Sequence, residues 1–132
     1  MAVLSEPLQE ITVRKNYIDG EWSESKGVRH DIVNPATQKV IAHVPTSTKG
    51  EVLAAVEAAK RAFPEWRKVP PVTRARYLFR FRELLEEHFE DLSRIQTMEH
   101  GKTIDESRGE TRRGIENVEV AAGIHKWAPC SR

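Results

Sequence analysis

Cysteine and histidine, the side chains that most often do covalent or metal chemistry, do not form a cluster in this sequence. The one cysteine, Cys130, could serve as a nucleophile, but it stands two residues from the C-terminal end. A catalytic thiolate needs a charge or dipole that lowers its pKa and walls that exclude water, and neither is expected there. The histidines, at positions 30, 43, 88, 100 and 125, lack the spacing of metal ligands. We therefore predict no catalytic residue and no metal site.

The glycines and arginines do not define a binding site by themselves either. The seven glycines never form the pattern that follows a strand, opens a helix and holds phosphate groups, so no cofactor-binding residue is predicted. Arginines stand among aromatic residues between positions 67 and 82, which is also a feature of nucleic-acid-binding surfaces. Glutamates accompany them, and the net charge of the chain is only +1. A solvated helix face with its aromatic side chains in the core is the preferred interpretation, without a nucleic-acid partner.

Length and composition fit one domain with a modest core. The chain has 132 residues, of which 39% are hydrophobic and 31% are charged. No apolar segment is long enough to span a bilayer, and Met1–Ile11 lacks the apolar block of a secretory signal. A single cysteine excludes an internal disulfide, so we expect a reducing, cytoplasmic setting. The net charge of +1 and the lack of a long apolar segment predict no membrane partner.

The elements that would position a site form an α+β pattern, with a small antiparallel β-sheet followed by three or four helices. Residues 1–14 show no clear period and are expected to be a flexible N-terminus. Residues 15–47 form the β region, with tight turns at Asp19-Gly20 and at Asn34-Pro35. Such a sheet is marginal alone and needs a helix to cover it.

Residues 48–124 carry helical periodicity. Two threonines are followed three residues later by glutamate, which is the pattern of a capping box at a helix start. These pairs are Thr48 with Glu51 and Thr103 with Glu106. The first helix is expected to break at Pro64 and the Val69-Pro70-Pro71 group.

The central helix should run from Pro71 to Gly101, because proline suits a first helical turn and glycine suits a helix end. It is the densest apolar run in the chain, so other segments are expected to pack on it. Arg74 falls on its apolar side and is expected to pair with a carboxylate or a carbonyl group.

The third helix should run from Thr103 towards Ile124. Its first half is nearly all polar, and Gly109 and Gly114 each cost about 1 kcal/mol of helix propensity. Such a helix needs a reason to form, either packing on a missing neighbour or lining a site.

Five short motifs resemble, in the same order and spacing, the beginning of the NAD(P)-dependent aldehyde dehydrogenases. They are residues 16–22, 33–37, 62–66, 74–76 and 99–103. The resemblance covers about Lys15 to Gly123. Residues 113–121 look like those of the CoA-acylating methylmalonate-semialdehyde dehydrogenases within that family. The tail, residues 125–132, departs from the family pattern.

The resemblance implies that residues 15–124 are the N-terminal part of a cofactor domain. In the family, the dinucleotide-binding sheet, the oxyanion-hole asparagine, the general-base glutamate and the nucleophilic cysteine come later, and none matches a residue here. NAD and CoA are therefore implied for the full-length family, and no cofactor is expected on this chain alone. Arg113 corresponds to the arginine that recognises the substrate carboxylate, although an exposed arginine of a charged helix could also have no such role.

Two functions remain open. The chain is either the N-terminal segment of an NAD- and CoA-dependent semialdehyde dehydrogenase, inactive alone, or a free-standing helical interaction module without catalysis. In the isolated chain the apolar face of Val52, Val56 and Phe63 has too little to bury against, because the resemblance implies that these helices cover a sheet formed by later residues. We therefore expect self-association or a missing remainder of the enzyme.

Overall fold

The computed structural model describes residues 11–123, which form two compact units. The first unit contains the residues up to Lys68 together with Met98–Gly101, and the second contains Val69–Thr97 and the residues from Lys102 onwards. The flexible N-terminus was predicted over residues 1–14; residues 1–10 lie outside the described residues, whereas Thr12–Val13 form a short strand. The predictions of a divergent tail and of a non-catalytic Cys130 also lie outside the described residues.

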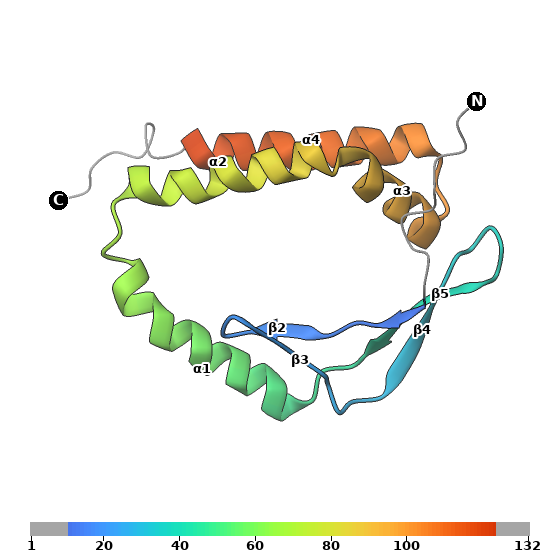
Figure 1. The fold of residues 1–132 in the computed structure, drawn as a ribbon, viewed down its shortest axis with the longest axis horizontal. Coiled ribbons are helices and arrows are strands. Elements are labelled where there is room, and N and C mark those ends of the chain that lie inside the picture. Colours follow the sequence, from blue (N-terminus) through green and yellow to red (C-terminus); the bar gives the residue numbers. More distant parts are fainter. Residues whose placement is uncertain (1–10, 124–132) are drawn as a thin grey trace. The chain divides into compact units, whose positions relative to one another are not determined.

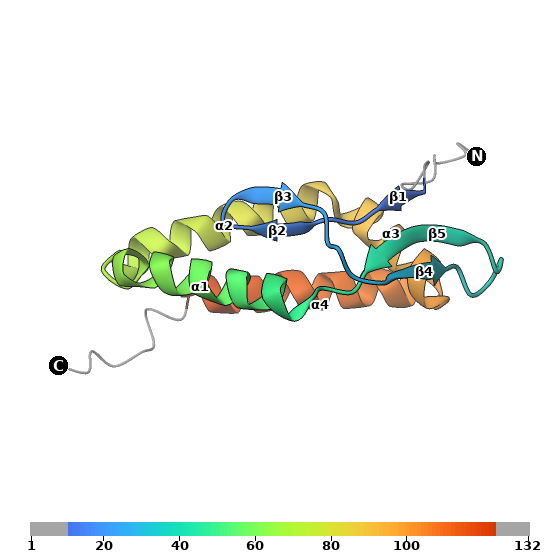
Figure 2. The same ribbon diagram turned by 90° about the horizontal axis from the view of Figure 1, so that it is seen from below.

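The larger sheet of the first unit has the strand order β1 (Thr12–Val13), β5 (Val40–Pro45) and β4 (Arg29–Val33). Figure 2 shows β5 between the other two strands. β4 pairs with β5 in antiparallel fashion as expected, but β1 pairs with β5 in parallel. The predicted antiparallel pairs within residues 15–47 are therefore present, and the parallel pair comes from a strand that the sequence did not predict. β1 is only two residues long, and a pattern so short carries no signal of its distant partner.

The second sheet is the predicted hairpin of β2 (Asn16–Ile18) and β3 (Glu21–Ser23). Its two turn residues, Asp19 and Gly20, have φ angles of 56° and 84°. Positive φ at both positions matches the right-handed twist of the two strands, which explains the Asp-Gly sequence.

The carboxylate of Glu51 joins the start of α1 (Lys49–Trp66) to the loop between β3 and β4. It accepts hydrogen bonds from the Thr48 N–H at 2.7 Å, the Ser25 hydroxyl at 2.7 Å and the Lys26 N–H at 3.0 Å. The Thr48 hydroxyl in turn accepts from the Glu51 N–H, so the predicted capping box is confirmed. These bonds, first of all that from the Thr48 backbone, lower the pKa of Glu51 to about 2.

Acid should weaken the first unit through Glu51. Because its pKa in the folded chain is about 2 and its ordinary value is 4.5, its stabilising effect is fully present above pH 4.5 and is lost as the pH falls towards 2. The midpoint of thermal unfolding should therefore differ most between the natural chain and Glu51→Gln near neutral pH. The difference should close as the pH approaches 2. A difference that does not change with pH would contradict this role.

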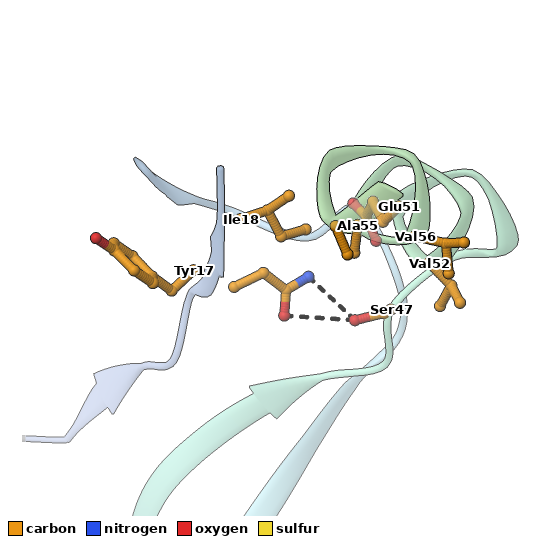
Figure 3. A pocket seen from close by; sticks show the side chains of 9 residues that line it. Tyr17, Ile18, Ser47, Glu51, Val52, Ala55 and Val56 are labelled. Atoms are coloured by element: carbon orange, nitrogen blue, oxygen red, sulfur yellow. Dashed lines mark hydrogen bonds between the residues drawn. The ribbon is translucent and has the colours of Figure 1, made fainter. Parts of the chain in front are cut away.

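α1 does not break at Pro64, as the sequence led us to expect, but continues to Trp66. Pro64 lies in the last turn of the helix, where its missing N–H removes only one hydrogen bond near the end. The apolar side chains predicted to lack a partner are exposed, with Val52 at 52%, Val56 at 44% and Phe63 at 57% of their full accessibility. Figure 3 shows Val52 and Val56 beside a groove of about 420 Å³ that β2 also lines.

The predicted central helix is two helices, α2 (Pro71–Glu87) and α3 (Phe89–His100), separated at His88. The expectation of one continuous helix is therefore wrong, and Figure 1 shows α3 turning away from the axis of α2. Gly101 ends α3 as predicted, with a φ of +81°.

The core of the second unit lies where α2 packs along α4 (Ile104–Gly123). Its buried apolar side chains are few and mostly small. Ala75, Ile115 and Ala122 are 6%, 1% and 1% exposed. The aromatic side chains expected in a core are instead about half exposed or more, at positions 77, 79 and 81 of α2. Residue spacing alone could not show that alanine, not these aromatic residues, faces α4.

Within residues 11–123, Arg74 lacks the ion pair or hydrogen bond that we expected. Its Nε is buried and has no hydrogen-bond partner among the described residues. Within residues 11–123, no helix has both the length and the apolar character needed to cross a membrane.

Candidate functional site around Arg113

Arg113 is the single site residue that the sequence singled out, and it lies on the outer side of α4. It precedes the fully buried Ile115 by two residues, so about 200° of helix rotation separates the two side chains. Arg113 is exposed and makes no hydrogen bond or ion pair with the other residues of 11–123. Its guanidinium is therefore available to an anion.

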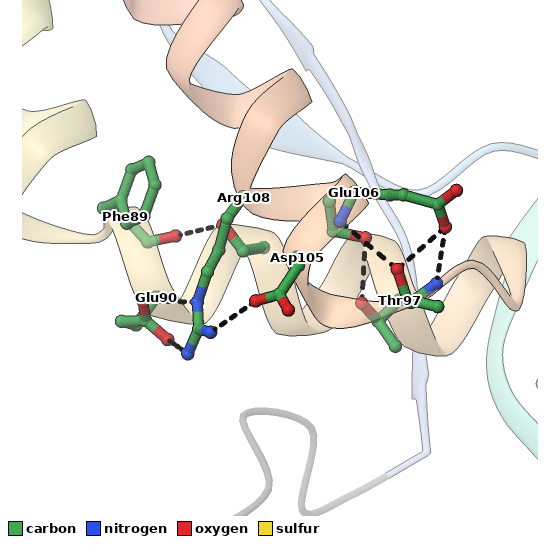
Figure 4. Close-up of polar contacts among 9 residues, drawn as sticks. Phe89, Glu90, Thr97, Asp105, Glu106 and Arg108 are labelled. Carbon is green, nitrogen blue, oxygen red and sulfur yellow. Dashed lines mark hydrogen bonds and ion pairs between the residues drawn. The ribbon is translucent and has the colours of Figure 1, made fainter.

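The arginine five residues earlier behaves differently. Arg108 donates two hydrogen bonds to the Glu90 carboxylate, both at 2.9 Å, and a third to Asp105 at 3.1 Å. Figure 4 shows this fork across α3 and α4. The hydrogen bonds from Arg108 hold the pKa of Glu90 below its ordinary value. Arg108 thus serves the packing of the helices.

Arg112, the immediate neighbour of Arg113, is also engaged. It donates a hydrogen bond of 2.5 Å to Glu86 of α2 and stands 4.8 Å from the centre of the Phe89 ring. The hydrogen bond from Arg112 lowers the pKa of Glu86. A surface pair of this kind contributes little to stability alone, but it shows that adjacent arginines of α4 have separate surroundings.

A seam of buried hydroxyl groups explains why the polar first half of α4 forms a helix. Ser93 and Ser107 are both 0% exposed. The Thr97 hydroxyl donates to the Ser107 hydroxyl at 2.8 Å, and the Ser93 hydroxyl lies 3.0 Å from that of Thr111. These hydrogen bonds between α3 and α4 satisfy the buried hydroxyl oxygens, and Figure 4 shows Thr97 in this contact.

This hydroxyl seam was not predicted from the sequence, although a signal was present. Ser93 and Thr97 are four residues apart, and so are Ser107 and Thr111. Residues at that spacing share one helix face. Two such pairs in neighbouring helices could have indicated a hydroxyl-lined contact. The seam fixes which side of α4 faces inwards and thereby which side carries Arg113.

Two glycines of α4, on either side of Arg113 in the sequence, have no packing reason to be glycine. A Cβ added at Gly109 or at Gly114 would have no atom within 4 Å. Alanine at either position should therefore raise the free energy of unfolding by about 0.5 to 1 kcal/mol in urea titrations. Gly101→Ala is the matched control and should lower it, because Gly101 has positive φ and a Cβ there would lie 2.6 Å from Pro35 Cγ. A loss of stability in both α4 variants would show contacts that the structure lacks.

No group of three or more histidine, cysteine, aspartate or glutamate side chains within residues 11–123 is placed to hold a metal ion. Cys130 lies outside that range. The geometry around Arg113 by itself offers anion binding and no covalent chemistry.

Comparison with known proteins identifies the family of this chain. The aldehyde dehydrogenase family matches residues 22–127. The chain therefore belongs to the aldehyde dehydrogenase family, which confirms the resemblance of the five motifs. It is 52% identical over 121 residues to malonate-semialdehyde dehydrogenase 1 of Shouchella clausii, a match that covers 91% of this chain and 25% of that protein.

Solved structures agree with the sequence relatives. The methylmalonate-semialdehyde dehydrogenase of Oceanimonas doudoroffii has a TM-score of 0.82 and 38% identity, covering 89% of this chain and 24% of its own. A mutant of aldehyde dehydrogenase C from Pseudomonas syringae, solved with NAD+ and octanal, has a TM-score of 0.80 and 37% identity over 84% of this chain and 23% of its own. The chain thus spans about a quarter of the length of the relatives it matches.

Proposed function

We propose that this chain is the N-terminal part of an NAD-dependent, CoA-acylating enzyme that oxidises malonate or methylmalonate semialdehyde. The observation that carries the proposal is the 52% identity over 91% of the chain to a malonate-semialdehyde dehydrogenase. A free-standing interaction module is not favoured, because the family match runs through nearly all of the described residues. A cytoplasmic setting, expected from the single cysteine, is part of the proposal.

The proposed reaction oxidises an aldehyde to a CoA thioester, with NAD accepting the hydride. Substrates of this class carry a carboxylate besides the aldehyde group. In this proposal Arg113 binds that carboxylate, because a planar guanidinium can meet both carboxylate oxygens. The exposure of Arg113 and its lack of an anionic partner among residues 11–123 support the assignment. If Arg113 were instead an exposed arginine without function, its replacement would not discriminate between carboxylated and simple aldehydes.

The remainder of the enzyme is the partner that this function requires. Residues 11–123 contain no site for a nucleophile or a dinucleotide that the sequence or the geometry identifies. We therefore propose that the isolated chain is inactive and binds NAD only weakly. The apolar side chains of α1 would be covered either by that remainder or by self-association.

A chimera tests the proposed function. Residues 1–123 of this chain would replace the matching segment of the Shouchella clausii relative. The chimera should reduce NAD and form acyl-CoA when malonate semialdehyde and CoA are supplied. The isolated chain is the control and should show no saturable NAD binding by calorimetry. A folded chimera that binds NAD but oxidises only aldehydes without a carboxylate would overturn the proposed substrate class.

A further inference from the structure

The break between α2 and α3 at His88 falls in a sequence that favours one helix. From Val72 to His100 the chain contains neither proline nor glycine, which are the usual causes of a sharp kink. His88 nevertheless has a φ of −102° and a ψ of 18°, outside the helical region. Helical hydrogen bonds continue on both sides, because the His88 N–H donates to the Leu84 carbonyl at 3.1 Å and the His88 carbonyl accepts from the Leu92 N–H at 3.0 Å. No helix-breaking residue explains the interruption.

Two arginines of α4 hold the chain on both sides of this break. Arg112 donates a hydrogen bond to Glu86 in the last turn of α2, and its guanidinium lies 4.8 Å from the centre of the Phe89 ring at the start of α3. Arg108 holds Glu90, the second residue of α3, through two hydrogen bonds of 2.9 Å. These two arginines and their three partners, Glu86, Phe89 and Glu90, are named the arginine clamp below.

We propose that the arginine clamp imposes the interruption at His88, and that residues 71–100 form one continuous helix when the clamp is released. The local sequence favours the continuous helix, because Leu85, Phe89 and Leu92 keep the spacing of one helix face across the break. One surface ion pair contributes little to stability. Two charge-assisted pairs and a ring contact, however, converge on residues 86–90 and act together against that preference.

Ser93 offers the competing, local explanation of the bend. Its hydroxyl donates to the Phe89 carbonyl at 2.8 Å, and a serine bonded to its own helix in this way can bend it. The two causes respond to different changes. A bend made by the clamp depends on the charges of α4, whereas a bend made by Ser93 depends on a hydroxyl group of α3.

Acid should release the clamp in the natural chain. The hydrogen bonds from Arg112 and Arg108 hold the pKa values of Glu86 and Glu90 below the ordinary 4.5. The clamp is therefore complete above pH 4.5 and is lost as the pH falls through the lowered pKa values.

The other charged groups around the clamp do not replace the two glutamates. Arginines of α2 and α3 face the glutamates, and carboxylates of α4 face the clamp arginines. These groups are Arg82, Arg94, Asp105, Glu116 and Glu119. Protonation of Glu86 and Glu90 thus leaves the clamp arginines with carboxylates of their own helix only.

The distance between spin labels on α2 and α3 measures the bend in the complete chain, without substrate or cofactor. Val72→Cys and Glu99→Cys, in a Cys130→Ser background, provide two exposed attachment sites. In a continuous helix they would be about 40 Å apart, at 1.5 Å per residue, and they are closer when the helix is bent. Arg108→Met together with Arg112→Met should lengthen the distance towards this value, with helical circular dichroism retained. The labelled chain without these two changes should lengthen in the same way below pH 4.5.

Arg80→Met is the matched control, because Arg80 pairs with Glu83 inside α2 and does not reach α4. It should leave the distance unchanged, and so should Ser93→Ala. An unchanged distance in the double arginine variant would overturn the proposal, as would a loss of helical circular dichroism in place of the lengthening. A lengthening in Ser93→Ala without one in the double arginine variant would assign the bend to Ser93.

Discussion

Replacing Gly27 with alanine should destabilise the first unit by about 3 kcal/mol or more. A Cβ at this position would lie 1.6 Å from the backbone oxygen of Thr46. That oxygen cannot move aside freely, because the N–H of Thr46 donates to the Val28 carbonyl at 2.8 Å and its carbonyl accepts from the Ser25 hydroxyl at 3.1 Å. Alanine must therefore move the loop away from Thr46 or break these hydrogen bonds.

Urea unfolding followed by circular dichroism measures this effect. Gly50→Ala in the same unit is the matched control, because the nearest atom to its Cβ would be the Thr48 hydroxyl at 3.9 Å. It should leave stability unchanged or raise it slightly. If Gly27→Ala were as stable as Gly50→Ala, the close approach of the loop to Thr46 would not exist in solution.

Features of the fold that depend on a few neighbouring residues could be predicted from the sequence. The Asp19-Gly20 turn follows from the need for two positive φ angles, and the start of α4 follows from the capping box at Thr103. Residue chemistry within four positions determines both. The same kind of local information placed the end of α3 at Gly101.

Features that depend on distant residues could not be predicted in this way. The parallel pairing of β1 with β5 places Thr12 beside Ala42. No hydrophobic periodicity in the neighbouring sequence indicates this pairing. The burial of Ser93 depends on α4, because the Thr111 hydroxyl lies 3.0 Å from the Ser93 hydroxyl. The buried Arg74 Nε, which has no hydrogen-bond partner within residues 11–123, is a feature of the same kind. The position of Arg74 on the apolar side of a helix predicts that its side chain turns inwards, but not which groups it contacts.

The candidate site shows the same division. The sequence placed Arg113 on a helix, and its resemblance to a family suggested a role. Only the structure distinguishes it from Arg108 and Arg112, which are engaged by carboxylates of α2, α3 and α4 itself. The proposal that Arg113 binds a substrate carboxylate depends on this difference between neighbouring arginines.

Removing the Arg113 guanidinium should lower the use of a carboxylated semialdehyde much more than the use of a simple aldehyde. The loss expected for one charge-assisted pair is about 2 kcal/mol, or roughly 30-fold in kcat/KM. Arg113→Lys should recover only part of it, because an ammonium cannot meet both carboxylate oxygens in one plane. Arg112→Ala is the matched control, and any loss it causes through Glu86 should be equal for both kinds of substrate.

The most direct measurement is kcat/KM of the chimera and of its Arg113→Ala variant, each with malonate semialdehyde and with propanal. The proposed function predicts that the variant loses roughly 30-fold or more with malonate semialdehyde and only a small factor with propanal. Equal losses with the two substrates would contradict it and would show that Arg113 has a structural role only.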